Sequence, residues 1–285
     1  MPRAPLSWGC RGAPQPAGDC PVRLHLNHSF SSYQEDVLFA RSFFCDVCAE
    51  RRSYVEIGAL DGVRFSNTLM LERELNFGGL LIEGHPMSAS CLERSRGPSG
   101  RNVIIKEAVC SPAGTLAFSG TPDGVAGDRS TMSDASRGRW ASHHNRLNFT
   151  VSCRPIGEML RQAGLQSVHL FSLDVEGAEL RVLQTMDWTI PVHVWSIELD
   201  GSNPPKDHAV RTLMLEHGYV FNRRIRINEV FVHADLVSSA QRRQEVCGGC
   251  IASGPRIWHN KHLDKGMDAA VAQEAMEKGR SKCFA

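Results

Sequence analysis

Short hydrophobic segments alternate with amphipathic segments through the middle of the chain. Strand-like apolar runs occupy 54–57, 80–82, 103–105, 168–173 and 192–199, and each is followed by glycine or a charged residue. Between them, apolar residues recur at helical spacing. Ile156, Met159, Leu160 and Ala163, for example, fall at i, i+3, i+4 and i+7 before Gly164. This alternation predicts an α/β fold, in which a mainly parallel sheet has helices on both faces.

The order of segments also predicts how the chain is divided. The last two strand-like segments, 219–227 and 229–234, are expected to pair antiparallel, because a parallel crossover needs a dozen or more residues. Within the domain, a short strand is expected at 115–119 and a polar loop from 120 to 148. The chain is accordingly divided into a loose, proline-rich N-terminal arm (1–30), one domain (31–236) and a polar C-terminal tail (237–285).

Composition and charge restrict the classes of function that the chain can have. The 285 residues include 32 Lys and Arg against 31 Asp and Glu, so the chain lacks the basic excess expected of a nucleic-acid-binding protein. No apolar run approaches the roughly 20 residues of a membrane span.

Residues 1–22 contain no signal-peptide core, which favours the cytoplasm. Ten cysteines and the sequons at Asn27 and Asn148 favour the alternative, a secretory lumen such as the endoplasmic reticulum or Golgi. The oligomeric state is left open.

The first strand and the turn after it indicate a ligand site, because open α/β sheets bind ligands at the carboxyl ends of their strands. Gly58 permits a close backbone approach and Gly62 frees the turn. Leu60 and Val63 stand where the dinucleotide fingerprint has glycine, which weakens the hypothesis of a nucleotide-dependent oxidoreductase. Glu83, after the second strand, is placed to accept both hydroxyls of a ribose. A nucleoside cofactor without pyrophosphate, such as S-adenosylmethionine, fits both observations. The alternative is a tight turn with a solvent-facing Glu83.

Several sequence blocks, taken together and in order, resemble the FkbM family of methyltransferases. They are Val-Glu-Ile-Gly-Ala-Leu-Asp-Gly (55–62), Ser-Asn-Thr (66–68), Gly-Leu-Leu-Ile-Glu (79–83) and Asp-Val-Glu-Gly-Ala-Glu (174–179), with Gln34-x-Asp36 and Phe43-Phe44 upstream. The resemblance covers about 31–236. It implies a class I methyltransferase (Rossmann-like) fold with seven strands, the last antiparallel. It also implies S-adenosylmethionine as the cofactor and transfer of a methyl group, usually to a hydroxyl oxygen.

The resemblance also implies roles for single residues. Those around the methionine part of the cofactor would be Glu56, Gly58, Ala59, Asp61 and Gly62, and Asn67 in the next block is also expected to bind the cofactor. Glu83 would bind the ribose. Lys106, Glu107 and Ala108 would lie near the adenine. The 120–148 segment matches no family pattern, so the acceptor substrate stays open.

A second group of carboxylates ends the fourth parallel strand. Carboxylates in a first helical turn are stabilised by the helix dipole, which explains part of the pattern. Asp174 also lies at the carboxyl edge of a central strand, where an O-methyltransferase needs a base, because a neutral hydroxyl is a poor nucleophile. Asp174 and Glu176 are therefore the candidate catalytic residues, and Glu198, near the end of the next strand, is a third candidate.

Cysteine and histidine residues give weaker signals. Cys45-x-x-Cys48 and Cys247-x-x-Cys250 are both expected at the edge of the sheet opposite the site, where they could bind zinc, form disulfides or stay independent. His85 and the His143-His144 pair are interpreted as loop histidines, and no metal site is assigned.

The sequence therefore predicts an S-adenosylmethionine-dependent O-methyltransferase. Its expected acceptor is a hydroxyl on a glycan or a small metabolite, with no nucleic-acid partner. The alternative is a binding or adaptor protein that keeps the methyltransferase fold without activity. The carboxylates at the expected site argue against it, because an inactive site has no need of them.

Overall fold

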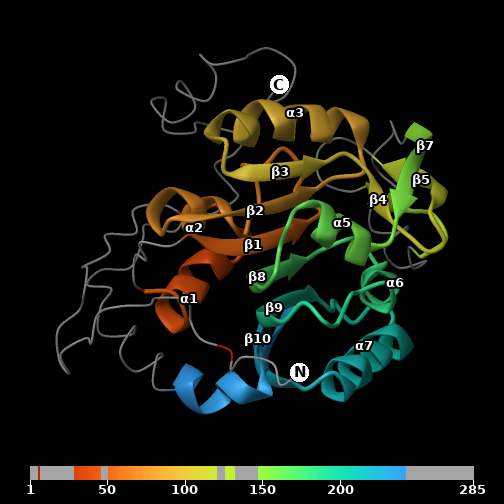
Figure 1. The fold of residues 1–285 in the computed structure, drawn as a ribbon. Helices are drawn as coiled ribbons and strands as arrows, with labels where there is room; N and C mark the ends of the chain where they lie inside the picture. Colours follow the sequence, from red (N-terminus) through yellow and green to blue (C-terminus); the bar gives the residue numbers. More distant parts are fainter. Residues whose placement is uncertain (1–5, 7–28, 46–50, 121–125, 132–146, 242–285) are drawn as a thin grey trace.

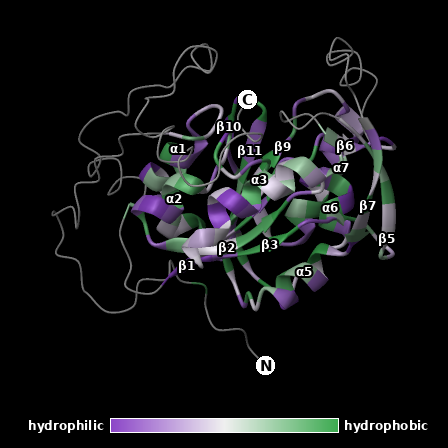
Figure 2. Ribbon diagram, turned by 90° about the horizontal axis from the view of Figure 1, so that it is seen from above, coloured by the Kyte–Doolittle hydropathy of each residue, from purple (hydrophilic) through white to green (hydrophobic). Residues whose placement is uncertain are grey.

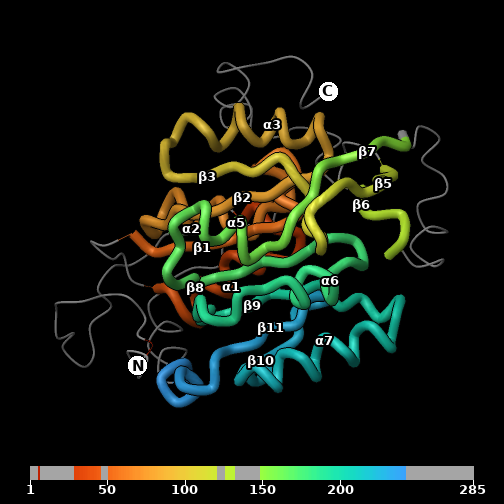
Figure 3. Tube along the Cα trace, turned by 45° about the vertical axis from the view of Figure 1, so that its right-hand side comes forward, coloured from red at the N-terminus to blue at the C-terminus, as the bar shows by residue number. Residues whose placement is uncertain are grey.

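A seven-stranded sheet forms the centre of the computed structural model, which describes residues 6, 29–45, 51–120, 126–131 and 147–241. Most of the expected arm and tail lies outside these residues. The strand order is β10-β11-β9-β8-β1-β2-β3. Figure 1 shows the sheet, and the order can be followed in Figure 3. The bounds are β1 (Arg52–Ile57), β2 (Phe77–Ile82), β3 (Asn102–Ile105), β8 (Val168–Leu173), β9 (Val192–Glu198), β10 (Tyr219–Ile225) and β11 (Asn228–His233). Strands β3, β2, β1, β8 and β9 run parallel, and β11 runs antiparallel to both β9 and β10.

These pairings confirm the predicted α/β fold with a mixed sheet and the predicted antiparallel pairing of the last two strands. The central strands are continuous apolar runs because both of their faces are covered. All six residues of β8 are buried, as are all but the last residue of β9. Figure 2 shows hydrophobic residues concentrated in these strands.

Helices cover both faces of the sheet. One hydrophobic core joins the sheet to α1 (Glu35–Ser42), α2 (Leu69–Glu74) and α3 (Pro86–Arg96). The other joins it to α5 (Ile156–Gln162), α6 (Glu179–Gln184) and α7 (Pro204–Glu216). Their ends follow from sequence: α3 and α7 both begin with proline after a residue whose side chain caps the first turn, His85 and Asn203 respectively. Short 3₁₀ helices follow α3, at Gly97–Ser99, and β11, at Ala234–Leu236. Among the described residues, no helix is long and apolar enough to cross a membrane.

A second, four-stranded sheet lies to one side of the first (Figure 3). It consists of β4 (Ala108–Val109), β5 (Gly114–Gly120), β6 (Ala126–Asp128) and β7 (Leu147–Arg154), in the order β4-β7-β5-β6. The expected strand at 115–119 lies within β5 and is confirmed. The expected loop over 120–148 is wrong at β6 and at the start of β7. Within β7, Phe149, Val151 and Cys153 alternate with polar residues, a strand signal directly after the expected loop that the sequence analysis left unassigned.

The described cysteines are disulfide-bonded. Cys110 pairs with Cys153 and links the segment after β4 to β7, and Cys45 and Cys91 are also in disulfides. A disulfide-bonded Cys45 cannot serve as a zinc thiolate, so the four-cysteine zinc hypothesis is wrong for this state of the chain. The other three cysteines of that hypothesis lie outside the described residues. Among the residues described, no cluster of potential ligands could hold a metal ion.

Candidate active site

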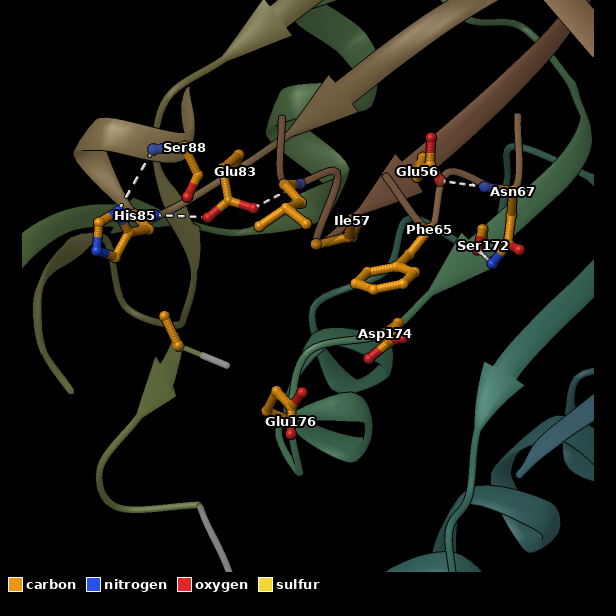
Figure 4. Close-up of a pocket in the computed structure, with 13 residues that line it drawn as sticks. Glu56, Ile57, Phe65, Asn67, Glu83, His85, Ser88, Ser172, Asp174 and Glu176 are labelled. Carbon is orange, nitrogen blue, oxygen red and sulfur yellow. Dashed lines mark hydrogen bonds between the residues drawn. The ribbon is translucent and has the colours of Figure 1, made fainter. Parts of the chain in front are cut away.

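A pocket opens at the carboxyl ends of β1, β2 and β8, where the sequence places its candidate site. Glu56, Gly58, Asn67, Glu83, Asp174 and Glu176 are among its lining residues. In Figure 4, Glu83 and His85 lie on one side of the pocket, and Asp174 and Glu176 lie on another. A neighbouring cavity shares Gly58, Glu83 and Asp174 and continues past Glu107 and Ala108 to the small sheet. The structure thus brings most of the predicted site residues together.

The turn after β1 depends on Gly58. This residue has a φ of +80°, and a Cβ atom built there would lie 1.9 Å from the carbonyl oxygen of Asp174. Any side chain would therefore push β1 and β8 apart at the pocket. The backbone N–H of Asp174 in turn donates to Ile57 O over 3.2 Å, which closes the gap between the two strand ends. Glycine is required here by close packing of the two backbones.

Glu56 organises one wall of the pocket. Its buried carboxylate accepts hydrogen bonds from Ser66 Oγ (2.9 Å), Asn67 N (2.6 Å) and Thr68 Oγ1 (2.6 Å). The Asn67 side chain donates to Ser172 Oγ over 2.9 Å, while its Oδ1 is buried with no hydrogen-bond partner among the described residues. Because a buried polar atom without a partner is costly, Asn67 Oδ1 is an acceptor available to a ligand.

Glu83 is the acidic residue at the end of β2. Its Oε2 accepts from Leu60 N (2.8 Å) and its Oε1 from His85 N (2.6 Å). Burial raises the pKa of Glu83 to about 7, although these backbone N–H groups lower it, and the nearby charge of Asp61 raises it further. Each carboxylate oxygen carries two lone pairs, so both can accept one more hydrogen bond from a ligand hydroxyl.

Asp174 and Glu198 form a carboxyl pair at the ends of β8 and β9. Their side chains are hydrogen-bonded to each other. Burial raises the pKa of Asp174 to about 6, and burial together with the charge of Asp174 raises the pKa of Glu198 well above its usual range. A pair of this kind titrates jointly and shares one proton near neutral pH.

Glu179, the last residue of the same sequence block, has a different position. It is fully buried and accepts from Gly177 N (3.0 Å) and from Lys206 Nζ (2.5 Å). It therefore stabilises the loop between β8 and α6 and is not a lining residue of the pocket. Glu176 does line the pocket. Its backbone φ is +55°, a conformation that residues other than glycine rarely adopt.

Three predicted cofactor residues lie behind the pocket wall. The Asp61 carboxylate accepts from Val63 N, Arg64 N and Arg64 Nε at 2.7 to 2.9 Å, so it holds the turn. Gly62 packs on α3, since a Cβ there would lie 2.5 Å from Arg96 Cγ. Ala59 is buried beside them and hydrogen-bonds the end of β2 through its N–H. None of the three is among the residues that line either cavity.

The small sheet supplies a wall that sequence reasoning missed. Leu116, Phe118 and Ala126 line the neighbouring cavity, and a Cβ on Gly84 would lie 3.1 Å from the Phe118 ring. Strand β6 is attached to α6 by an ion pair between Asp128 and Arg181. Phe65, 36% exposed with a φ of +60°, lines the first pocket and was also missed. A lone aromatic residue in a loop gives no pattern from which a site could be predicted.

The two cavities are acidic. Their lining carboxylates are Glu56, Glu83, Glu107, Asp128, Asp174 and Glu176, and no Lys or Arg of the described residues lines either cavity. Arg154 pairs with Glu107 over 2.9 Å, and Arg181 pairs with Asp128, so the carboxylates at that end are compensated. Glu83, Asp174 and Glu176 gather in the first pocket. This arrangement favours a cationic or neutral ligand over an anionic one.

The open sheet, its glycine turn and the acidic pocket at its carboxyl edge define a Rossmann-like α/β protein with a ligand site at the strand ends. The family model described as the methyltransferase FkbM domain matches residues 56–221, more than half of the chain. The chain therefore belongs to the FkbM family of methyltransferases, and the resemblance carried by its sequence motifs is confirmed.

Methyltransferases are among the similar solved structures. They include the FkbM methyltransferase from Methylobacillus flagellatus KT (11% identity, TM-score 0.41), the methyltransferase domain of METTL16 (10%, 0.39) and human methyltransferase-like protein 13 in complex with SAH (14%, 0.32). The matches cover 70%, 70% and 75% of this chain, and 53%, 66% and 87% of the other chains. The chain thus spans about half of the FkbM structure. A search of the curated proteins found no match.

Proposed function

We propose that this protein is an S-adenosylmethionine-dependent O-methyltransferase acting on an uncharged hydroxyl of a glycan or small metabolite. The observation that carries the proposal is the pocket itself. In a chain of the FkbM methyltransferase family, it gathers Glu83, Asp174 and Glu176 at the carboxyl edge of the sheet, and none of the described Lys or Arg residues lines it.

The described residues fit the cofactor. Glu83 would accept the ribose hydroxyls with the lone pairs that its two backbone contacts leave free. Gly58 and Asn67 would lie beside the methionine part, where Asn67 Oδ1 offers an acceptor to an ammonium group. Glu107, Ala108 and Phe118 would lie around the adenine. Bound there, the cofactor supplies an electrophilic methyl group with a positively charged sulfonium, which suits an acidic cleft.

Asp174 is the proposed base. When the proton of the carboxyl pair resides on Glu198, the Asp174 carboxylate can accept the proton of an acceptor hydroxyl as its oxygen attacks. Asp174 is also fixed in place by its backbone hydrogen bond to β1, so it can align the hydroxyl with the reacting methyl group. Glu176, on the same loop, would orient the acceptor.

The carboxylates of the pocket restrict the charge that an acceptor substrate can carry. Two like charges 4 Å apart repel by roughly 4 kcal/mol at the effective dielectric constant of a protein surface. An acceptor carrying phosphate or carboxylate near Asp174 and Glu176 would meet this repulsion, and no Lys or Arg in the described part of the chain lines the pocket to offset it. A neutral polyol avoids the cost. A cationic amine also avoids it, so methylation of nitrogen is the outcome that the assay must separate from methylation of oxygen.

Two measurements test the proposal. Calorimetric titration at pH 8, above the raised pKa of Glu83, with S-adenosylmethionine and S-adenosylhomocysteine should give saturable binding that weakens about tenfold or more in Glu83→Gln, because a charge-assisted contact is lost. Glu93→Gln, an exposed carboxylate on α3, is the matched control. Transfer of a radiolabelled methyl group to a panel of neutral glycans and polyols, amines and phosphorylated sugars should label the neutral hydroxyls. Absence of cofactor binding would favour the adaptor alternative, and labelling of amines alone would refute O-methylation.

A further inference from the structure

The sequon Asn148-Phe149-Thr150 lies on β7, with its two recognition residues on one face of the strand. Side chains at i and i+2 of a strand point to the same side. Phe149 points to the other side, where its ring centroid lies 4.8 Å from that of His85 and 5.9 Å from that of Phe118. Asn148 and Thr150 are exposed. The acceptor amide and the hydroxyl that glycosyltransferases recognise are thus both presented outward, away from the aromatic cluster.

The cysteines provide an independent observation. Each of the four cysteines in the described part of the chain is disulfide-bonded. The Cys110–Cys153 bond anchors the far end of β7, the strand that carries the sequon. Disulfides form and persist in oxidising compartments and are rare in the cytosol. Asparagine-linked glycosylation belongs to secreted proteins, which pass through such compartments.

We propose that Asn148 is N-glycosylated and that the protein matures in the oxidising lumen of the secretory pathway. In the transfer, the Asn148 side-chain nitrogen forms a bond to the anomeric carbon of an oligosaccharide carried on a lipid pyrophosphate. The bond from that carbon to the pyrophosphate oxygen breaks, the lipid pyrophosphate leaves, and a proton from the amide nitrogen passes to a base of the transferase. The proposal is independent of the methyltransferase activity.

The position of Asn148 suits a bulky modification. Figures 1 and 3 place β7 at the periphery of the molecule. On one side β7 pairs with β5 from Leu147 to Cys153, while β4 pairs only with Cys153 and Arg154 in the described part of the chain. A glycan at Asn148 would cover the edge that β4 leaves unpaired and oppose pairing with a second chain. Because Asn148 points away from Phe149, the glycan would leave the pocket open.

The test uses the full 285-residue chain, secreted from cultured animal cells behind a cleavable leader. Trypsin cuts after Arg146 and after Arg161 but not at the Arg154–Pro155 bond, so β7 is released within one peptide, 147–161, separate from the second sequon at Asn27. Enzymatic removal of N-glycans in heavy-oxygen water should convert Asn148 to labelled Asp in this peptide. Thr150→Ser, which keeps the sequon, should retain the glycan, and Thr150→Ala should lose it.

Cysteine mapping of the same secreted protein tests the disulfide on which the argument for an oxidising compartment rests. The Cys110–Cys153 disulfide should be recovered in the non-reduced digest. An unmodified Asn148 in the secreted wild-type protein would overturn the glycosylation site. Free thiols at Cys110 and Cys153 would overturn the argument for an oxidising compartment. Binding of S-adenosylhomocysteine by Thr150→Ala should equal that of Thr150→Ser, since neither side chain faces the pocket.

Discussion

Replacing Glu83 with glutamine should change the stability of the protein in a pH-dependent way. Burial raises the pKa of Glu83 from 4.5 to about 7. Between these values the folded protein holds a proton that the unfolded chain has released, so folding stability falls as pH rises through this window. Below about pH 4.5 the penalty is absent, and above about pH 7 it is complete. At 1.36 kcal/mol for each unit of pKa shift, it amounts to about 3 kcal/mol.

Glutamine removes this titration but adds a constant cost. One side of its amide is an NH₂ group, which would face the N–H of Leu60 or of His85 where Glu83 now accepts from both. Leaving such a buried donor without a partner costs about 1–3 kcal/mol at every pH. Near pH 4.5 the free energy of unfolding of Glu83→Gln should therefore be lower than that of wild type. Between pH 4.5 and pH 8 the difference between the two free energies should change by about 3 kcal/mol in favour of the variant.

Urea unfolding of the cofactor-free proteins at several values between about pH 4.5 and 8 measures the difference directly. Asp174 and Glu198 titrate in the same range, but both are present in wild type and variant, so the comparison isolates Glu83. Glu93→Gln, exposed beside Lys106, should run parallel to wild type. Parallel curves for Glu83→Gln would refute the reasoning, because they would mean that Glu83 is not held in a protonated, buried state.

Three further changes have defined outcomes. Asp174→Asn should abolish methyl transfer while S-adenosylhomocysteine binding stays within a few-fold of wild type; turnover at the wild-type rate would exclude Asp174 as the base. Arg96→Met should lower the free energy of unfolding by about 3–5 kcal/mol, because Glu72, now 2.5 Å from Arg96 Nη2, would be left buried without its partner; a loss under 1 kcal/mol in urea unfolding would contradict this. Cys110→Ser with Cys153→Ser should lower stability by up to about 4 kcal/mol, the chain-entropy value for a separation of 43 residues; an unchanged melting temperature would count against it.

The sequence predicts the large sheet well because its signals are local. Continuous apolar runs mark the buried parallel strands, and the short gap between 225 and 228 leaves no room for a crossover between β10 and β11. It predicts the small sheet poorly. Strand β6 is three residues long, Ala-Gly-Asp, which is too short for any periodicity. Its position is set by contacts with distant residues, through the Asp128–Arg181 ion pair.

The candidate site shows the same limit. Family blocks locate Glu56, Glu83 and Asp174 in the pocket, because strand ends are fixed by the sheet. They do not separate Asp61, which holds the turn, from residues that line the pocket. Both kinds of residue occur in one short block, and only the direction of each side chain distinguishes them. That direction follows from backbone conformation in a turn, where neither the helical nor the strand period applies.

The energetic cost of the pocket argues that it is a working site. Leu60, Phe65 and Glu176 all line it with a φ between +51° and +60°. Such conformations cost on the order of 1–3 kcal/mol each in residues other than glycine, and they persist only where the surrounding structure enforces them. Burial of Glu83 and of the Asp174–Glu198 pair adds a further penalty above about pH 7. A protein that used this fold only as a scaffold would gain stability by losing these features. Their concentration around one pocket supports the proposed binding of a cationic cofactor and the proposed deprotonation of an acceptor.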